Sequence, residues 1–229
     1  MQARDVMTSP VLTVKAETPV AEVAAFLLEH RISAAPVEDE NGRMVGIVSE
    51  GDLMRRPETG TERHASWWLM LMSDPRRDAR EYLKSHGLQA KDVMSLRVVT
   101  VAEDTPLDQI ADQLEKHGIK RVPVLKDGKV VGIVSRANLL RALVARPQSG
   151  PVAADDRALR EAVMQALRST GARTLYVNVV VSEGVVHLWG MAYSNEEREA
   201  LRVAAQGVPG SKDVQVRINV MPRGSGSTG

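Results

Sequence analysis

Two short stretches carry polar side chains whose types and spacing suit nucleotide chemistry. In the first, Ser49, Gly51 and Asp52 follow an apolar, β-branched run over residues 45–48, which predicts a buried strand that turns into a helix. Unpaired amides at a helix start can bind phosphate, and a carboxylate can accept hydrogen bonds from both hydroxyls of a ribose. The alternative is that Ser49 or Asp52 caps the helix.

The second stretch repeats the first, with Ser135 and Asn138 at the positions of Ser49 and Asp52. The preceding block repeats as well, which indicates a duplicated unit. The matched positions are Asp5, Val6, Met7, Thr18, Pro19, His30, Ile32, Pro36 and Val37 in the first copy and Asp92, Val93, Met94, Thr105, Pro106, His117, Ile119, Pro123 and Val124 in the second.

Composition sets the outer bounds. The chain has 229 residues, 43% of them hydrophobic and 3% aromatic, so Val, Leu, Ile, Ala and Met must build the cores of more than one domain. The absence of Cys excludes thiol catalysis and cysteine-ligated metal sites. The net charge of +1 gives no reason to expect a nucleic-acid partner. Without an apolar signal core at the amino terminus, the expected location is cytoplasmic, with peripheral membrane contact as an open possibility.

Each copy reads as β-α-β-β-α. In the first copy we expect a small strand ending at residue 14, a helix with Thr18 as N-cap and Pro19 at its first position, and strands over 32–37 and 44–48 joined by a turn at 39–42. The second copy keeps this pattern, with Thr105 and Pro106 starting its helix. His30 and His117 lack a second ligand at metal-binding spacing, so we expect no metal site.

Both copies resemble CBS domains, named after cystathionine β-synthase, and the pair resembles a Bateman module. The motifs that carry the resemblance are the T-P helix start, the I-x-x-x-P-V strand and G-I-V-S-x-x-D. The resemblance implies two β-α-β-β-α units around a pseudo-twofold axis and frequent homodimerisation. It also implies regulatory binding of AMP, ATP, NAD or S-adenosylmethionine in clefts between the repeats. It does not imply catalysis, and no catalytic residues are predicted.

In this family, the aspartate of the motif holds the ribose, and the neighbouring hydroxyl contacts ribose or phosphate. Ser49 and Asp52 fit this pattern, whereas Asn138 brings no charge beside Ser135. Charge-assisted hydrogen bonds are roughly twice as strong as neutral ones. We therefore expect the Asn138 cleft to bind more weakly or with a different selectivity.

Basic residues before the strand proline often contact phosphate in this family. Only the second copy has them, and a solvated strand end is the alternative interpretation. One cleft is expected to combine Ser49, Asp52, Val98, Val99, Lys120, Arg121 and Val122. The other is expected to combine Val11, Leu12, Ala34, Ser135 and Asn138.

A third domain follows a linker, and its pattern is α-β-β-α-β. Its first strand is expected to begin at Leu175, and its two helices are expected to cover one face of a three-stranded sheet. It resembles the BON domain through S-E-G-V-V-H-L-W-G, which ends at Gly190, and G-V-P-G-S-K-D-V, which begins at Gly207. That resemblance implies contact with phospholipid or the cell envelope. Acidic and basic residues balance in this domain, and a polybasic membrane patch needs an excess of basic residues, so a protein partner is an equal expectation.

The predicted boundaries divide the chain into six parts. They are a first CBS copy (1–60), a helical insertion (61–90), a second copy (91–145), a linker (146–151), the BON-like domain (152–222) and a flexible tail (223–229). The insertion is expected to form a helix over 61–72 that carries Trp67 and Trp68, and a second helix from Asp74. We expect the insertion to pack on its own module. The alternative is that it forms a dimer contact or a docking face for the third domain.

These features together favour a non-enzymatic sensor. An adenine nucleotide would change the packing of the repeats, and the BON-like domain would report the change to a partner. The alternative is a constitutive dimeric scaffold, or a membrane- or envelope-associated interaction protein, without nucleotide sensing.

Overall fold

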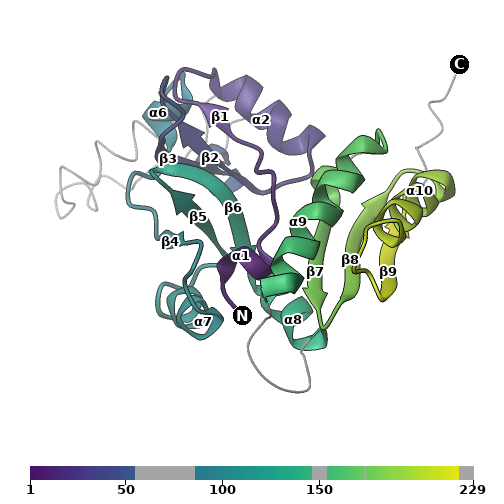
Figure 1. Ribbon diagram of the computed structural model, residues 1–229. Helices are drawn as coiled ribbons and strands as arrows, with labels where there is room; N and C mark the ends of the chain where they lie inside the picture. The colour runs from purple at the N-terminus through teal and green to yellow at the C-terminus, as the bar shows by residue number, and fades with distance from the viewer. Residues whose placement is uncertain (55–85, 146–153, 173, 222–229) are drawn as a thin grey trace, which may run out of the picture. The chain divides into compact units, whose positions relative to one another are not determined.

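A computed structural model describes residues 1–54, 86–145, 154–172 and 174–221 (Figure 1). The predicted helices of the insertion, the linker and the tail lie outside these ranges. The chain divides into two compact units. The smaller unit comprises Leu12–Val99 and Asp127–Val130, and the larger comprises Met1–Val11, Thr100–Lys126 and Val131–Gly229.

The smaller unit holds the first repeat. Its strand order is β1-β2-β3, with β1 parallel to β2 and β2 antiparallel to β3. The apolar stripe of α2 contributes Val23 and Leu27 to the same buried cluster as Val37 and Val48 of the sheet. The elements are β1 (Val14–Lys15), α2 (Val20–Glu29), β2 (Ala34–Glu38), β3 (Met44–Ser49) and α3 (Glu50–Leu53).

The second repeat has the same order of elements, which confirms the predicted duplication of a β-α-β-β-α fold. Its strands lie in the order β4-β5-β6. Ile110 and Leu114 of its first helix are fully buried. The elements are β4 (Val101–Ala102), α7 (Leu107–Lys116), β5 (Arg121–Lys126), β6 (Lys129–Ser135) and α8 (Arg136–Val144).

A short segment precedes each repeat in the sequence, and it belongs to the unit that contains the other repeat. We call residues 2–8 and 89–95 the first and second leading segments; they contain α1 (Ala3–Val6) and α6 (Ala90–Val93). The first belongs to the larger unit and the second to the smaller. Each ends in an antiparallel bridge to the last strand of that unit's repeat, formed by Thr8 with Ile133 and by Ser95 with Ile47.

The structure corrects the predicted helix starts. Pro19 and Pro106 were expected at the first helical position. They instead occupy the N-cap positions of α2 and α7. The hydroxyls of Thr18 and Thr105 accept hydrogen bonds from backbone amides three residues upstream. The two threonines therefore close the turn before each helix and do not cap it. The first strand is also shorter than expected, because only Val14–Lys15 pairs with β2.

The third domain has the predicted α-β-β-α-β order. β7 pairs antiparallel with β8, and β8 pairs parallel with β9, so β7 is an edge strand of its sheet. A short 3₁₀ turn, η2 (Thr174–Tyr176), precedes β7, so the strand begins later than the expected Leu175. The elements are α9 (Ala154–Ser169), β7 (Val177–Ser182), β8 (Val185–Ala192), α10 (Asn195–Gln206) and β9 (Asp213–Val220).

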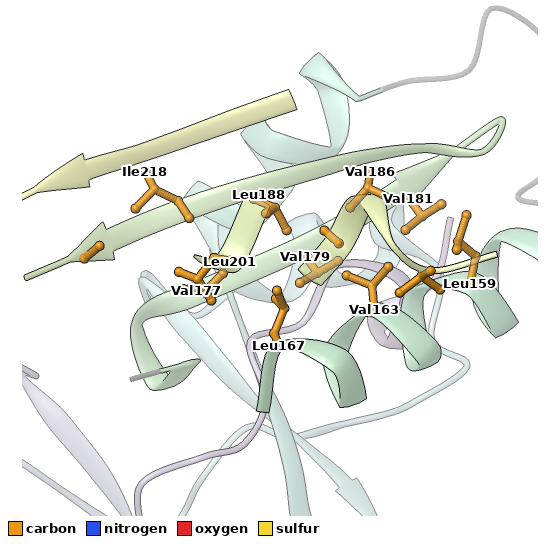
Figure 2. Packing of buried hydrophobic residues seen from close by; sticks show 13 residues of the cluster. Leu159, Val163, Leu167, Val177, Val179, Val181, Val186, Leu188, Leu201 and Ile218 are labelled. Atoms are coloured by element: carbon orange, nitrogen blue, oxygen red, sulfur yellow. The ribbon is translucent and has the colours of Figure 1, made fainter. Parts of the chain in front are cut away.

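Helices α9 and α10 cover one face of this sheet, as predicted. Figure 2 shows Val163 and Leu167 of α9 pointing toward strand residues such as Val179 and Leu188, with Leu201 of α10 in the same cluster. Nevertheless, all six residues of β7 are buried. The opposite face of β7 is covered as well, because α1 of the first leading segment packs against it.

None of the helices in the described ranges combines the length and apolarity that crossing a bilayer requires.

Replacing Gly190 by Ala is expected to destabilise the third domain by about 3 kcal/mol or more. Its φ is +148°, and an added Cβ would overlap the backbone carbonyl of Tyr176. Gly171→Ala is the matched control, because φ is also positive there but nothing lies within 4 Å of the added Cβ; we expect a loss of about 1 kcal/mol. Hydrogen exchange of the β7 and β8 amides measures both losses, and equal losses would contradict the steric explanation.

Candidate functional site

The first polar motif lies where β3 ends and α3 begins. Ser49 occupies the N-cap of α3. The Asp52 carboxylate accepts hydrogen bonds from the Ser49 amide at 3.0 Å and from its hydroxyl at 2.7 Å, and Asp52 is 9% exposed. The helix-cap interpretation is therefore confirmed for this pair. Ribose binding by the same carboxylate stays a prediction.

The second motif has the same cap and an additional set of bonds. Asn138 Oδ1 accepts from the Ser135 amide at 2.9 Å and from its hydroxyl at 2.6 Å. Asn138 Nδ2 donates to the Val6 carbonyl at 2.8 Å and to Thr8 Oγ1 at 3.3 Å. The side chain is 2% exposed. Asn138 thus ties the motif to the first leading segment.

This tie depends on the chemistry of an amide. An ionised carboxylate only accepts hydrogen bonds, whereas an Asn side chain both accepts and donates. Asp52 can therefore form the cap in its own repeat but cannot, when ionised, donate to a carbonyl as Asn138 does. The replacement of Asp by Asn makes the two motifs chemically different.

The first leading segment lies directly on the second motif. Thr8 and Ile133 exchange backbone hydrogen bonds of 2.9 and 3.1 Å. Met7 packs so closely on Gly132 that an added Cβ at Gly132 would collide with its side chain. Met94 packs on Gly46 in the same way in the smaller unit. The glycine of each G-I-V-S motif is therefore required by close packing of a leading segment.

The remaining predicted site residues divide between the units. Lys120 is exposed, Arg121 is half-buried and Val122 is fully buried. Because both predicted clefts draw on both units, their composition stays a prediction. The larger unit contains Val11, Lys120, Arg121, Val122, Ser135 and Asn138, and the smaller contains Leu12, Ala34, Ser49, Asp52, Val98 and Val99.

Sequence reasoning missed three polar residues of the third domain that bind the first leading segment. Arg157 of α9 donates through Nε to Asp5 at 2.8 Å and through its terminal nitrogen to Gln2 Oε1 at 3.1 Å. Arg160 of α9 donates to the Met7 carbonyl at 2.8 Å. Asn178 of β7 donates to the Val6 carbonyl at 3.0 Å.

A sequence signal for two of these residues did exist. Arg160 directly follows Leu159, which begins the apolar stripe of α9, and Asn178 interrupts the run of valines in β7. A polar residue within a buried pattern requires a hydrogen-bond partner. The sequence could indicate that a partner exists, but not that the partner lies at the other end of the chain.

Burial changes the electrostatics of this contact. Arg160 is 7% exposed, and desolvation lowers its pKa to about 10, opposed by the negative charges of Asp5 and Glu161. The hydrogen bond from Arg157 to Asp5 raises the pKa of Arg157. Both guanidinium groups therefore remain charged at neutral pH, and the contact carries two cations against the buried Asp5.

A separate hollow of about 620 Å³ lies at the start of α10, lined by residues that include Tyr193, Glu196 and Glu197. Glu197 accepts from the Tyr193 amide at 2.6 Å, and the Ser194 hydroxyl accepts from the Glu197 amide at 3.1 Å. These bonds cap the start of α10. In a capping box Glu197 would accept from the amide of the N-cap residue Ser194, whereas here it accepts from the amide of Tyr193, one residue earlier. Within the described ranges, no group of three or more His, Cys, Asp or Glu side chains could hold a metal ion.

Two family models match this chain. The model of the CBS domain matches residues 3–58 and 90–145. The model of the BON domain matches residues 155–222.

Two curated proteins of Methanocaldococcus jannaschii are similar to the first part of the chain. Uncharacterized protein MJ1426 is 31% identical over 158 residues, which cover 63% of this chain and 92% of that protein. L-aspartate semialdehyde sulfurtransferase is 28% identical over 139 residues, which cover 60% of this chain. The chain spans 22% of the length of that enzyme.

Among solved structures, CBSX2 in complex with AMP is similar to this chain at a TM-score of 0.55 and 28% identity. The match covers 64% of this chain and 99% of that structure. CBSX2 is a chloroplastic CBS domain-containing protein of Arabidopsis thaliana.

Asn138→Asp is expected to destabilise the second repeat by about 3 kcal/mol at pH 7. The new carboxylate would face the buried Val6 carbonyl, to which it cannot donate. Hydrogen exchange of the β6 amides measures the loss. Asn195→Asp is the control, because Asn195 is exposed; we expect a change within about 0.5 kcal/mol there. Equal effects of the two substitutions would show that the bond to Val6 contributes nothing.

Proposed function

Because the chain belongs to the CBS-domain family, as a tandem CBS pair followed by a BON domain, we propose that it is a regulatory protein that binds an adenosine-containing ligand. The observation that carries this proposal is the likeness of the CBS pair to CBSX2 bound to AMP, which extends over 99% of that structure. AMP is the first ligand to test, and ATP, NAD and S-adenosylmethionine are further members of the same class. The proposed role is regulation and not catalysis.

We assign the ribose to the first motif, where Asp52 would accept hydrogen bonds from the sugar hydroxyls with Ser49 beside it. Lys120 and Arg121 are the proposed phosphate ligands, because they are the basic residues next to the strand proline of the second repeat. Val98, Val99 and Val122 are the proposed adenine contacts. For the Asn138 motif we propose weaker binding, because its side chain already bonds the first leading segment.

The proposed mechanism is a ligand-dependent shift between two arrangements of the chain. A ligand at about 100 times its dissociation constant stabilises the bound state by about 2.7 kcal/mol. It shifts the equilibrium only if its affinity differs between the two arrangements. The BON domain would transmit the change to a protein or a phospholipid surface. A cytoplasmic homodimer is the proposed working form.

A constitutive scaffold is the second candidate. It is favoured by the bonding of Asp52 and Asn138, because both side chains have structural roles as caps. A protein whose motif residues serve only the fold would give no thermal response to AMP. A rise of several degrees in the melting temperature with AMP would favour the regulatory protein.

Asp52→Asn is expected to weaken AMP binding about tenfold while the fold is retained. An amide can form the cap, as Asn138 does with Ser135, but it loses the charge that strengthens a bond to a ribose hydroxyl. Isothermal titration calorimetry with AMP measures the change. Glu29→Gln makes the same chemical change at an exposed position of α2 and is expected to bind as the unsubstituted protein does. Unchanged affinity in Asp52→Asn would remove Asp52 from the site.

Lys120→Ala is expected to weaken AMP binding about fivefold and to leave adenosine binding unchanged, because an exposed lysine contributes up to about 1 kcal/mol to an ion pair. Competition between the two ligands in the same titration separates their affinities. An equal loss for AMP and adenosine would contradict the assignment of Lys120 to the phosphate.

A further inference from the structure

One backbone oxygen joins the second motif to the BON domain. The Val6 carbonyl accepts from Asn138 Nδ2 at 2.8 Å and from Asn178 Nδ2 at 3.0 Å. The two asparagines are 2% and 3% exposed, and a carbonyl oxygen can accept two hydrogen bonds. A displacement of Val6 therefore breaks bonds to both domains.

The first leading segment covers β7 on the sheet face opposite the helices of the BON domain. The alternation along β7 directs Val177, Val179 and Val181 into the helix-covered core, so Asn178 lies on the opposite face. Both faces of β7 are buried, whereas Arg217 and Asn219 of β9 are exposed. The covered part of this opposite face includes the edge strand that α1 contacts and His187 of β8, which is 7% exposed.

Asn178 contacts the first leading segment through its donor group. Its Nδ2 donates to the carbonyls of Val6 and Met7 at 3.0 and 3.3 Å. Its buried Oδ1 has no hydrogen-bond partner among the described residues. Leaving a buried acceptor unsatisfied destabilises the folded state. This position therefore favours a side chain that donates to the leading segment over one that only packs.

Charge makes the contact specific. Asp5 is 3% exposed and is paired with Arg157 at 2.8 Å. Arg160 donates to the Met7 carbonyl and, within its own domain, to the Val179 carbonyl at 2.9 Å. Removing one partner from a buried charged contact leaves an uncompensated charge. The first leading segment and the BON domain are therefore held together by directional bonds, which can be broken and reformed.

The same segment occupies the groups that a ligand would need at the second motif. Oδ1 of Asn138 accepts from Ser135, and its Nδ2 donates to Val6 and Thr8. A sugar hydroxyl that bonds Asn138 must compete with these partners. Ligand entry at this motif and contact of the segment with Asn138 therefore oppose each other.

We propose that the BON domain is an intramolecular latch, which holds the first leading segment on the Ser135–Asn138 motif and thereby opposes binding of an adenosine-containing ligand there. This inference rests on the proposed function for the identity of the ligand. Because coupling between two equilibria is reciprocal, ligand at this motif releases the BON domain. The BON domain, the first leading segment and the Asn138 motif all belong to the larger unit, so the latch is proposed for the Asn138 motif.

The test uses the full chain with the double substitution Arg157→Ala and Asn178→Ala. The bonds of these two side chains go to the first leading segment, at Gln2, Asp5, Val6 and Met7. The matched control is Asn195→Ala with Arg202→Ala, which removes the same two residue types from α10, where Arg202 pairs with Glu199. Hydrogen exchange of the Thr8 and Ile133 amides is measured without ligand. Calorimetry measures the affinity of the weaker AMP site, which the proposed function assigns to the Asn138 motif.

We expect the double variant to exchange the Thr8 and Ile133 amides about tenfold faster and to bind AMP at the Asn138 motif about tenfold more tightly, within the usual range of coupling between sites. The control should change neither quantity. Unchanged exchange would overturn the latch. Faster exchange with unchanged AMP affinity would overturn its coupling to the ligand and leave the proposed function intact. Absence of AMP binding in every variant would overturn the proposed function, and the exchange rates alone would then decide whether the BON domain holds the segment.

Discussion

Buried backbone carbonyls must find hydrogen-bond donors, and this requirement shapes the larger unit. The carbonyls of Val6 and Met7 lie between the second CBS repeat and the BON domain, and their donors come from both. Asn138 supplies a donor from one side, and Asn178 and Arg160 supply donors from the other. The first leading segment is therefore part of the core of this unit, although it lies at the start of the chain.

The duplicated sequence produced two repeats with the same order of elements and different chemistry. Both leading segments begin with Gln and Asp in a capping box, and both place a Met on the glycine of a G-I-V-S motif. The difference lies in the last motif residue. Asp52 accepts hydrogen bonds within its own cap, whereas Asn138 accepts and donates and so fixes a leading segment. The account therefore assigns ligand binding mainly to Asp52 and control by the BON domain to Asn138.

Much of the fold could be predicted from local patterns. The repeat, the order of the elements and the helix-covered face of the third domain follow from periodicity, and the structure confirms them. The roles of Thr18 and Thr105 were predicted wrongly, because a hydroxyl before a proline can close a turn as readily as it can cap a helix. The bonds of Asn138, Arg160 and Asn178 to the first leading segment could not be predicted, because these partners lie 130 or more residues away in the sequence. The site was therefore predicted as two similar motifs, and the long-range bonds that distinguish them required the structure.

The account depends on one claim, that ligand binding and the position of the first leading segment are linked. Hydrogen exchange of the unsubstituted protein, with and without millimolar AMP, tests this claim most directly. We expect AMP to accelerate exchange of the Thr8 and Ile133 amides, each of which donates to the backbone carbonyl of the other residue. Exchange that is unchanged or slower while calorimetry shows AMP bound at both sites would contradict it.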